Sequence, residues 1–240
     1  MNATLLIARR ELVAFFRSWL GPVIVSGALL IEGLLFYWFG LSQKALSAEV
    51  LQQFFYNTSG VTMAAALFLS MRLLAEERQT GTLMLLNTSP IHDREIVIGK
   101  YLGAFAVLAL TTLASVYMPA LIFVHGKVAV GHIVVGYVGL LLLGSAVTSI
   151  GLFASALARS QVVAVILGGA MLAVMILFWL VAKATEPPLN DFMSALALHH
   201  ENFRPFMQGI LEPSHVVYYL ALTYGFLLAS IKVLEARRWR

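Results

Sequence analysis

The stretch AEERQTGTLMLLNTSPIHDREIVIGK, residues 75–100, lies between two long apolar runs. In no other long part of the chain do charged, polar and turn-forming residues crowd together in this way. The whole chain is 60% hydrophobic and only 12% charged, whereas an ordinary soluble domain is about 25% charged. Because a soluble protein of 240 residues could not cover so much apolar surface, the sequence predicts a membrane protein.

Six apolar runs are each near the roughly 20 residues that a helix needs to cross a bilayer. We therefore expect an all-α integral membrane protein with one transmembrane domain, residues 1–240, and spans at 19–41, 54–74, 96–123, 133–157, 162–181 and 216–234. Residues 75–95 then connect the second and third spans. The longest connection on the opposite side is 182–215, for which we expect short helices at the outer surface.

The lysine and arginine residues predict the orientation of the chain. Of the 16 positive residues, all but four lie on the side of the termini and of residues 75–95, the exceptions being Lys44, Lys127, Lys183 and Arg204. Cytoplasmic connections of membrane proteins carry an excess of lysine and arginine. The sequence therefore predicts that both termini and residues 75–95 lie in the cytoplasm.

Residues 1–18 precede the first span. Apolar residues recur there at helical spacing, at Leu5, Ala8, Leu12, Phe15, Phe16 and Trp19. This pattern predicts an amphipathic helix on the cytoplasmic membrane surface. The alternative is a simple extension of the first span.

The quoted stretch can be interpreted residue by residue at its two ends. Glu76, Glu77 and Arg78 are expected to end the second span in water. Gly81 can adopt backbone angles closed to other residues and so redirect the chain. Lys100 lies early enough in the third span to extend its amine back to the membrane surface.

The middle of the stretch, TSPIHDRE, predicts the start of a new helix. Ser89 can cap free backbone amides, and Pro90 fits a first turn. Asp93 and Glu95 would lie near the positive end of that helix. A stiff, charged helical element at the cytoplasmic surface would suit docking to a partner, although a solvated loop remains the alternative.

The same stretch resembles the segment between the second and third spans in permeases of the type-2 ATP-binding-cassette (ABC) exporter family. The family pattern is Glu-Glu, three variable residues, Gly-Thr, an apolar stretch, a Pro-containing turn and a Gly-Lys pair. The chain matches it at Glu76, Glu77, Gly81, Thr82, Pro90, Gly99 and Lys100. Residues 206–239 are similar to the last span of the gliding-motility permease subgroup of this family.

The resemblance implies a permease subunit in a bacterial cytoplasmic (inner) membrane that moves an unidentified substrate, with export expected. It implies a dimer with a second copy or a paralogous subunit, and cytoplasmic ABC ATPase subunits that carry ATP and Mg²⁺. It also places a coupling helix in the quoted stretch, with the candidate ATPase-coupling residues Glu76, Glu77, Gly81, Thr82, Ser89, Pro90, His92, Asp93, Arg94 and Glu95.

The sequence itself contains no G-x-x-x-x-G-K-[ST] phosphate loop, so ATP would be hydrolysed by a partner chain. We therefore expect no enzyme activity, no catalytic residue and no cofactor on this chain. Two alternatives stay open: a membrane subunit that transmits mechanical signals without transport, and an ATP-independent transporter or channel. Nucleic-acid binding has no support, because the basic residues follow the membrane topology.

Glu32 is the one acidic residue deep within an expected span. An ionised side chain there costs about 2.5–3.5 kcal/mol on insertion scales. It could line a translocation path between two subunits, or it could hold helices together inside one subunit. The glycine and serine residues of span 133–157 have the spacing of closely packed helices, either within one subunit or at a dimer seam.

A histidine group lies in the outer connection 182–215, which could form an outer gate, a docking surface for an external accessory protein, or a structural cap. The group comprises His199, His200, Glu201 and His215. Adjacent histidines point in different directions on a helix, and no H-E-x-x-H spacing is present. We therefore expect no metal site there.

Overall fold

The protein is described by a computed structural model that covers residues 3–41, 46–82, 91–125 and 129–238. In these residues the chain forms helices and connections, with no strand. The elements are α1 (Ala3–Arg17), α2 (Leu20–Leu35), a π-helical turn η1 (Phe36–Leu41), α3 (Ser47–Ser70), α4 (Arg72–Gln79), α6 (Asp93–Ala114), α7 (Tyr117–His125), α8 (Val130–Leu157), α9 (Gln161–Ala184), α10 (Leu189–Leu196), α11 (Arg204–Met207) and α12 (Pro213–Arg238).

Six helical stretches in the described residues are long and apolar enough to cross a membrane, and they confirm the expected all-α membrane class. They are Leu20–Phe39, Ser47–Gln79, Asp93–Phe123, Val130–Leu157, Gln161–Ala184 and Pro213–Ala236. The second stretch extends well beyond the expected 54–74 at both ends. Hydropathy marks only the apolar part of a helix, and this helix continues into polar surroundings on either side.

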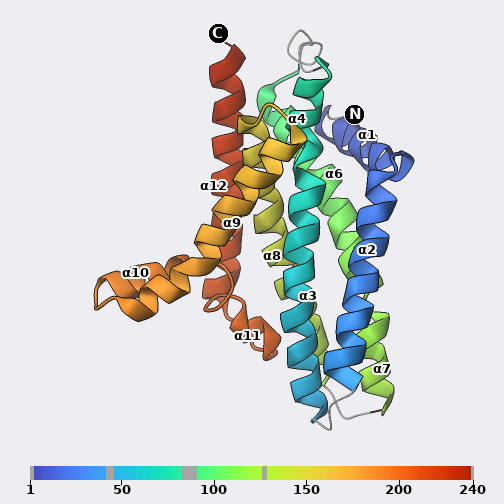
Figure 1. Ribbon diagram of the computed structural model, residues 1–240, viewed down its shortest axis with the longest axis vertical. Helices are drawn as coiled ribbons and strands as arrows, with labels where there is room; N and C mark the ends of the chain where they lie inside the picture. The colour runs from blue at the N-terminus through green and yellow to red at the C-terminus, as the bar shows by residue number, and fades with distance from the viewer. Residues whose placement is uncertain (1–2, 42–45, 83–90, 126–128, 239–240) are drawn as a thin grey trace.

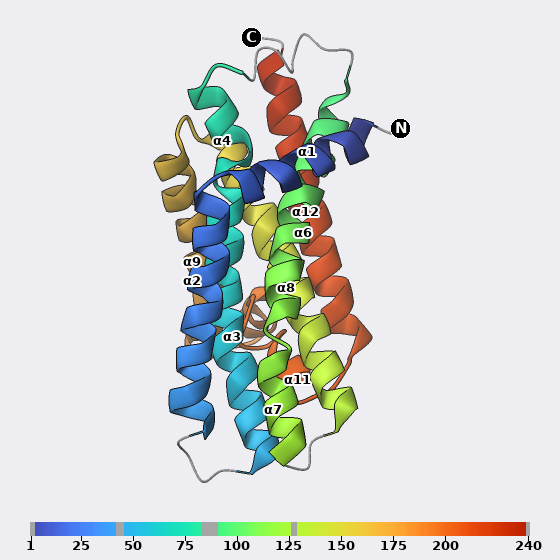
Figure 2. The same ribbon diagram turned by 90° about the vertical axis from the view of Figure 1, so that its right-hand side faces the viewer.

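Helix α8 lies in the middle of the bundle, where it packs against α3, α9, α12 and α6 (Figures 1 and 2). Its glycines permit this close approach. A Cβ atom on Gly144 would lie 2.7 Å from a methyl carbon of Leu108, and one on Gly136 would clash with the ring of Phe55. The small residues of α8 therefore serve packing within a single chain, which was one of the two uses that the sequence left open.

Helix α1 crosses the ends of the spans instead of continuing α2 (Figure 2). The chain bends at Ser18 and Trp19, and α1 packs mainly along α6. The side chains that α1 buries are those of Ile7, Glu11 and Phe15, at a spacing of four residues. Residues 3–17 are therefore a separate helix and not an extension of the first span.

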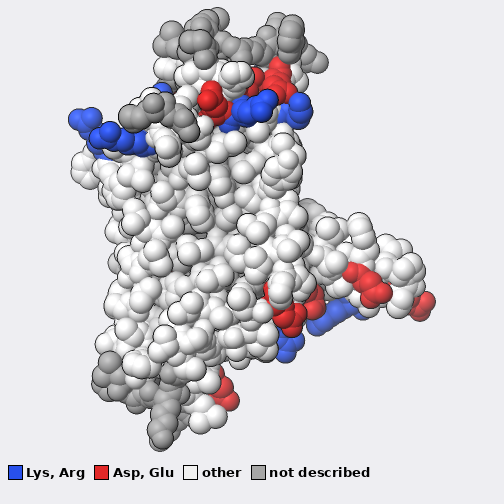
Figure 3. All heavy atoms as spheres, turned by 180° about the vertical axis from the view of Figure 1, so that it is seen from behind, with Lys and Arg blue, Asp and Glu red and all other residues white. Residues whose placement is uncertain are grey.

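Charged side chains gather near the two ends of the bundle. Figure 3 shows a broad uncharged belt between a group of charged residues at the end that carries α1 and a second group at the base of the protruding arm and along it. Such a belt is the surface that a helical membrane protein presents to lipid. The belt supports the assignment of a multi-pass membrane protein.

The arm consists of the end of α9 together with α10, and it projects sideways from the bundle (Figure 1). The chain after the arm is tied back to the bundle. The side-chain amide of Asn202 donates to the carbonyls of Ala195 and Ala197 at 3.2 and 2.8 Å, and the backbone amide of Leu198 donates to the carbonyl of Met175 at 3.1 Å. These contacts favour a structural cap for the chain that follows the arm.

Candidate functional site

A cluster of four charges joins three helices at the end of the bundle that carries α1; Lys100, Glu11 and Glu77 are largely buried in it, and Arg10 covers its outer side. Lys100 of α6 donates from Nζ to Oε1 of Glu11 on α1 and to Oε1 of Glu77 on α4, at 2.8 Å in both cases. Arg10 of α1 reaches the same two carboxylates at 3.0 and 2.8 Å. We call Arg10, Glu11, Glu77 and Lys100 the charge cluster. Its two positive and two negative groups balance, which is the condition for burying charges together.

The side chain of Lys100 is buried beneath α1 and binds two carboxylates, a pairing that the sequence did not predict. Its side chain is only 1% exposed, because α1 covers it. Burial alone would raise the pKa of Glu11, but the neighbouring Lys100 and Arg10 outweigh burial and hold that pKa below its ordinary value. Glu11 therefore stays ionised next to Lys100.

Two glycines of α6 allow α1 to come close enough for these contacts. A Cβ atom on Gly99 would lie 2.8 Å from Cβ of Ile7, and a Cβ atom on Gly103 would lie 2.6 Å from Cβ of Glu11 and 3.0 Å from the carbonyl oxygen of Ala8. Side chains larger than hydrogen would therefore push α1 away. This explains the Gly-Lys pair of the sequence. Gly99 has no side chain to block the close approach of α1, and Lys100 forms an ion pair with Glu11 of α1.

A second set of contacts holds the corner between α1 and α2 against α4. The guanidinium group of Arg72 lies 4.5 Å above the ring of Phe15, donates to Oγ of Ser18 at 2.9 Å and pairs with Glu76 at 3.1 Å. Arg72 and Glu76 are one helical turn apart, so this ion pair also stabilises α4 itself.

Ser155 of α8 is inserted into the junction between α3 and α4. Its hydroxyl group accepts hydrogen bonds from the backbone amides of Leu74 and Ala75 at 3.0 and 2.9 Å, and it donates to the carbonyl of Met71 at 2.7 Å. The serine thus replaces a regular helical hydrogen bond between Met71 and Ala75, and such an insertion interrupts a helix. The junction is therefore attached to α8 through the backbone.

Arg78 makes a further connection from α4 to α8. Its guanidinium group donates to the carbonyl oxygens of Ala156, at 2.9 Å, and of Ala158. The last carbonyls of a helix have no partners within the helix, and they carry partial negative charge. Arg78 satisfies them and fixes the end of α8 to α4. Glu76, Glu77 and Arg78 lie in the last turn before the helix ends at Gln79, and each of them also has a partner within the protein.

The new helix expected in the quoted stretch is α6 itself, and it begins later than predicted. Ile91 and His92 are not helical, and α6 starts at Asp93 with His92 as its N-cap. The carboxylate of Glu95 accepts a hydrogen bond from the backbone amide of His92 at 3.1 Å, which is half of a capping box. Ser89 and Pro90, the expected cap and first-turn proline, lie outside the described residues.

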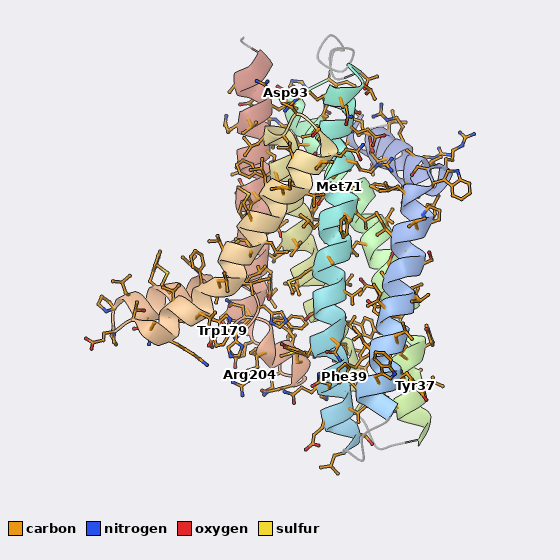
Figure 4. All side chains as sticks on the ribbon, viewed as in Figure 1. Tyr37, Phe39, Met71, Asp93, Trp179 and Arg204 are labelled. Atoms are coloured by element: carbon orange, nitrogen blue, oxygen red, sulfur yellow. The ribbon has the colours of Figure 1, made fainter. Side chains whose placement is uncertain are left out.

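Six of the candidate coupling residues separate into a buried and an exposed group, while Glu76 and Glu95 are half-buried. Asp93 is buried near the start of α6 (Figure 4), and Glu77 is nearly buried in the charge cluster. The exposed group comprises Gly81, Thr82, His92 and Arg94. Gly81 has a φ of +75°, the left-handed conformation for which its sequence position was singled out. The first group can carry force inside the chain, whereas the second can contact a partner.

A hollow of about 570 Å³ lies between these two groups. It is lined by residues of α1 and α4, by Thr80 and Thr82 after α4, and by Ile91 and Lys100. One oxygen of the Glu77 carboxylate, Oε2, is buried here without a hydrogen-bond partner in the described residues. The hollow thus brings the charge cluster next to the exposed chain on both sides of residues 83–90.

Glu32 lies inside the bundle of a single chain. Its side chain is 3% exposed, and Oε2 has no hydrogen-bond partner in the described part of the chain. Its neighbour Gly33 faces Met118 of α7. This position favours the interpretation in which Glu32 lies between helices of one subunit, since a path between two subunits would follow an outer face of the bundle.

The histidines of the outer connection have structural partners. His199 Nε2 lies 2.7 Å from Oγ of Ser59, the ring of His200 stacks on Trp179 at 4.4 Å, and His215 Nδ1 donates to Asn202 Oδ1 at 2.9 Å. No group of three metal-binding side chains comes together in the described residues. Sequence reasoning noticed these histidines but gave them no partner, because the contacts of His199 and His200 with α3 and α9, and that of His215 with Asn202, depend on tertiary packing.

His199 is expected to make the stability of the protein depend on pH. Burial, and next the neighbouring His200, lower the pKa of His199 to about 4, whereas an unfolded histidine titrates near 6.5. Between these two values the unfolded chain binds more protons than the folded one, so stability should be complete above pH 6.5 and fall as the pH drops toward 4. Melting temperatures measured across this range should show the decline.

The control for this prediction is His199→Gln, whose amide can still donate to Ser59. The variant should show a smaller loss of melting temperature between pH 6.5 and pH 4 than the unchanged chain. Parallel pH profiles for the two proteins would show that His199 is not the group responsible.

Comparison with known families assigns most of the chain to one of them. A family model described as "ABC-2 family transporter protein" matches residues 11–231, which include three of the four residues of the charge cluster and all six candidate spans in large part. A comparison with curated proteins found no match.

Proposed function

Because the chain belongs to the ABC-2 transporter family, we propose that it is the permease subunit of an ABC transporter that exports its substrate with ATP hydrolysed by separate cytoplasmic subunits. A second membrane subunit, identical or paralogous, would complete the transporter in a bacterial cytoplasmic membrane. The further placement in the gliding-motility subgroup rests on residues 206–239 alone and stays a prediction.

The observation that carries the proposal is the set of connections from α4. Glu77 connects α4 to α1 and α6 through the charge cluster. Ser155 and Arg78 connect α4 to the central helix α8. A force applied to the chain that joins α4 to α6 would therefore act on α1, α4, α6 and α8 together, because these contacts tie α4 to the other three helices.

The mechanism follows from this arrangement. The ATPases would bind the exposed surface formed by Thr82, His92 and Arg94, at the cytoplasmic ends of α4 and α6. When ATP draws the two ATPases together, that surface moves with them. The charge cluster and the contacts to α8 convert the motion into tilting of the spans, as a shift between two packed arrangements.

Arg94→Glu is expected to abolish or strongly weaken co-purification of the ATPase, while the permease still inserts and folds. Arg94 is exposed in the first turn of α6, where an acidic side chain is favourable for the helix. The change therefore reverses a surface charge without a folding penalty. The measurement is the amount of ATPase that remains bound to tagged permease after purification from membranes.

The matched control is Arg204→Glu, which reverses an exposed arginine on α11 near the base of the arm (Figure 4). This variant should retain the ATPase like the unchanged permease. Equal retention of the ATPase by both variants would contradict the docking surface, and equal loss would point to a general effect of charge.

A further inference from the structure

An apolar groove runs along the surface between α2 and α3. It has a volume of about 450 Å³, and every residue that lines it is apolar. Four of the lining residues are small, namely Gly27 and Ala28 of α2 with Ala64 and Ala65 of α3. Met71, between α3 and α4, is labelled in Figure 4 near the level where α1 meets α2, and it lines the end of the groove nearest α1. We call this feature the α2–α3 groove.

The length of the groove matches one leaflet of a bilayer. The lining residues extend over 20–31 of α2 and over 61–71, in α3 and the residue after it. At 1.5 Å per residue this is roughly 15–16 Å, or half of the ~30 Å hydrocarbon core of a membrane. A lipid acyl chain fills one leaflet, whereas a transmembrane helix of a second subunit would extend through both.

A positively charged hollow lies at the head of the groove. Its volume is about 420 Å³, and it is lined by Arg17, Trp19, Pro22 and other residues of the corner between α1 and α2. Val23 lines both the hollow and the groove, so the two are adjacent. Trp19 is 90% exposed there, and tryptophan is enriched where membrane proteins meet lipid headgroups.

Arg17 is available to a ligand. Among the described residues it is exposed and pairs with no carboxylate, in contrast to Arg10, which binds Glu11 and Glu77. A cation at the head of a leaflet-long apolar groove is complementary to a lipid with a negatively charged headgroup. Arg9 is exposed on the same helix but lies eight residues away, roughly 12 Å along α1.

From these observations we propose that Arg17 and the α2–α3 groove bind one anionic phospholipid of the cytoplasmic leaflet, with the headgroup at Arg17 and an acyl chain in the groove. The proposal rests on the membrane orientation of the chain and not on the ATPase partner. The bound lipid would cover a surface of the permease that no other part of the described chain covers.

Native mass spectrometry tests this proposal. The full chain is reconstituted in nanodiscs with equal amounts of phosphatidylglycerol and phosphatidylcholine, released, and the bound lipids are counted. The unchanged chain should retain more phosphatidylglycerol than phosphatidylcholine. Arg17→Gln should reduce that preference about fivefold, the effect of one basic side chain near a membrane surface, whereas Arg9→Gln should change it little because the Debye length is about 8 Å.

Gly27→Leu tests the acyl-chain site separately. No atom lies within 4 Å of the position that a Cβ on Gly27 would occupy, so the new side chain can enter the groove without disturbing the bundle. The variant should lose the retained lipid. Gly225→Leu on α12 is the control, since its Cβ position is equally open and lies outside the groove.

Two results would overturn the proposal. Lipid retention by Gly27→Leu equal to that of the unchanged chain would show that the groove is not the site, as would equal retention of both lipids by the unchanged chain. A dimer that dissociates in Gly27→Leu with no loss of lipid would show that a second copy of the chain fills the groove instead.

Discussion

Lys100→Met is expected to lower the free energy of unfolding by about 3–5 kcal/mol, the cost of removing one partner from a buried ion pair. The side chain of Lys100 is almost completely buried between Glu11 and Glu77. Methionine fills a similar volume but leaves the two carboxylates close together with Arg10 as their only cation among the described residues. The measurement is the thermal or denaturant-induced unfolding of the purified protein.

Lys232→Met is the matched control for this prediction. Lys232 also lies 2.8 Å from a glutamate, Glu235, but its side chain is 76% exposed. Exposed pairs contribute about 0–1 kcal/mol, so this variant should unfold almost like the unchanged chain. Adding Glu77→Gln to Lys100→Met should recover part of the stability, because it removes the second buried charge. Similar losses for Lys100→Met and Lys232→Met would contradict the buried charge cluster.

Gly103→Val is expected to detach α1 from α6 and to lower stability by an amount near that of Lys100→Met. A Cβ at position 103 meets Glu11 Cβ at 2.6 Å and the backbone of Ala8 at 3.0 Å, and backbone cannot move aside locally. Overpacking of this kind costs about 1–3 kcal/mol. Displacement of α1 also removes Glu11 from Lys100 and so adds part of the penalty for the broken ion pair.

Two comparisons check the Gly103 prediction in unfolding experiments. Gly225→Val introduces the same side chain where nothing lies within 4 Å of the Cβ position, and it should have a small effect. The double variant Gly103→Val/Lys100→Met should lose less stability than the sum of the two single losses, because both changes remove the same contact. Simple additivity would mean that α1 is not held by the charge cluster.

The class of the protein could be predicted from the sequence because the signal is local. Each span is a predominantly apolar run, and six such runs correspond to six helical stretches in the described residues. The turn at Gly81 could also be predicted from the sequence, since a glycine between two charged segments indicates a backbone conformation that other residues rarely adopt. Such features depend on residues that are neighbours in the chain.

The charge cluster could not be predicted from the same information. Lys100 and Glu11 are 89 positions apart, and a lysine near the end of a span normally extends toward water. One signal was present: Glu11 is an acidic residue midway between Ile7 and Phe15, at the spacing of a buried helical stripe. A charge on such a stripe requires a buried partner of opposite sign, but the sequence alone does not identify it.

The role of Ser155 could not be predicted from the sequence either. Serines of α8 could be recognised as small residues that favour close helix packing. That one of them would replace a backbone hydrogen bond between Met71 and Ala75 depends on how α8 and α3 are aligned in space. Such alignment is a property of tertiary packing and not of helical periodicity.

We propose that the exposed chain at the ends of α4 and α6 is the cytoplasmic contact of the ATPase. The natural chain has no cysteine, so Arg94→Cys provides a single attachment point for a crosslinker. We expect this variant to crosslink to the ATPase in membranes, with a yield that changes with nucleotide, and to react with a membrane-impermeant reagent only from the cytoplasmic side. Reaction only from the outer side, or no crosslink to an ATPase under any nucleotide condition, would contradict the account.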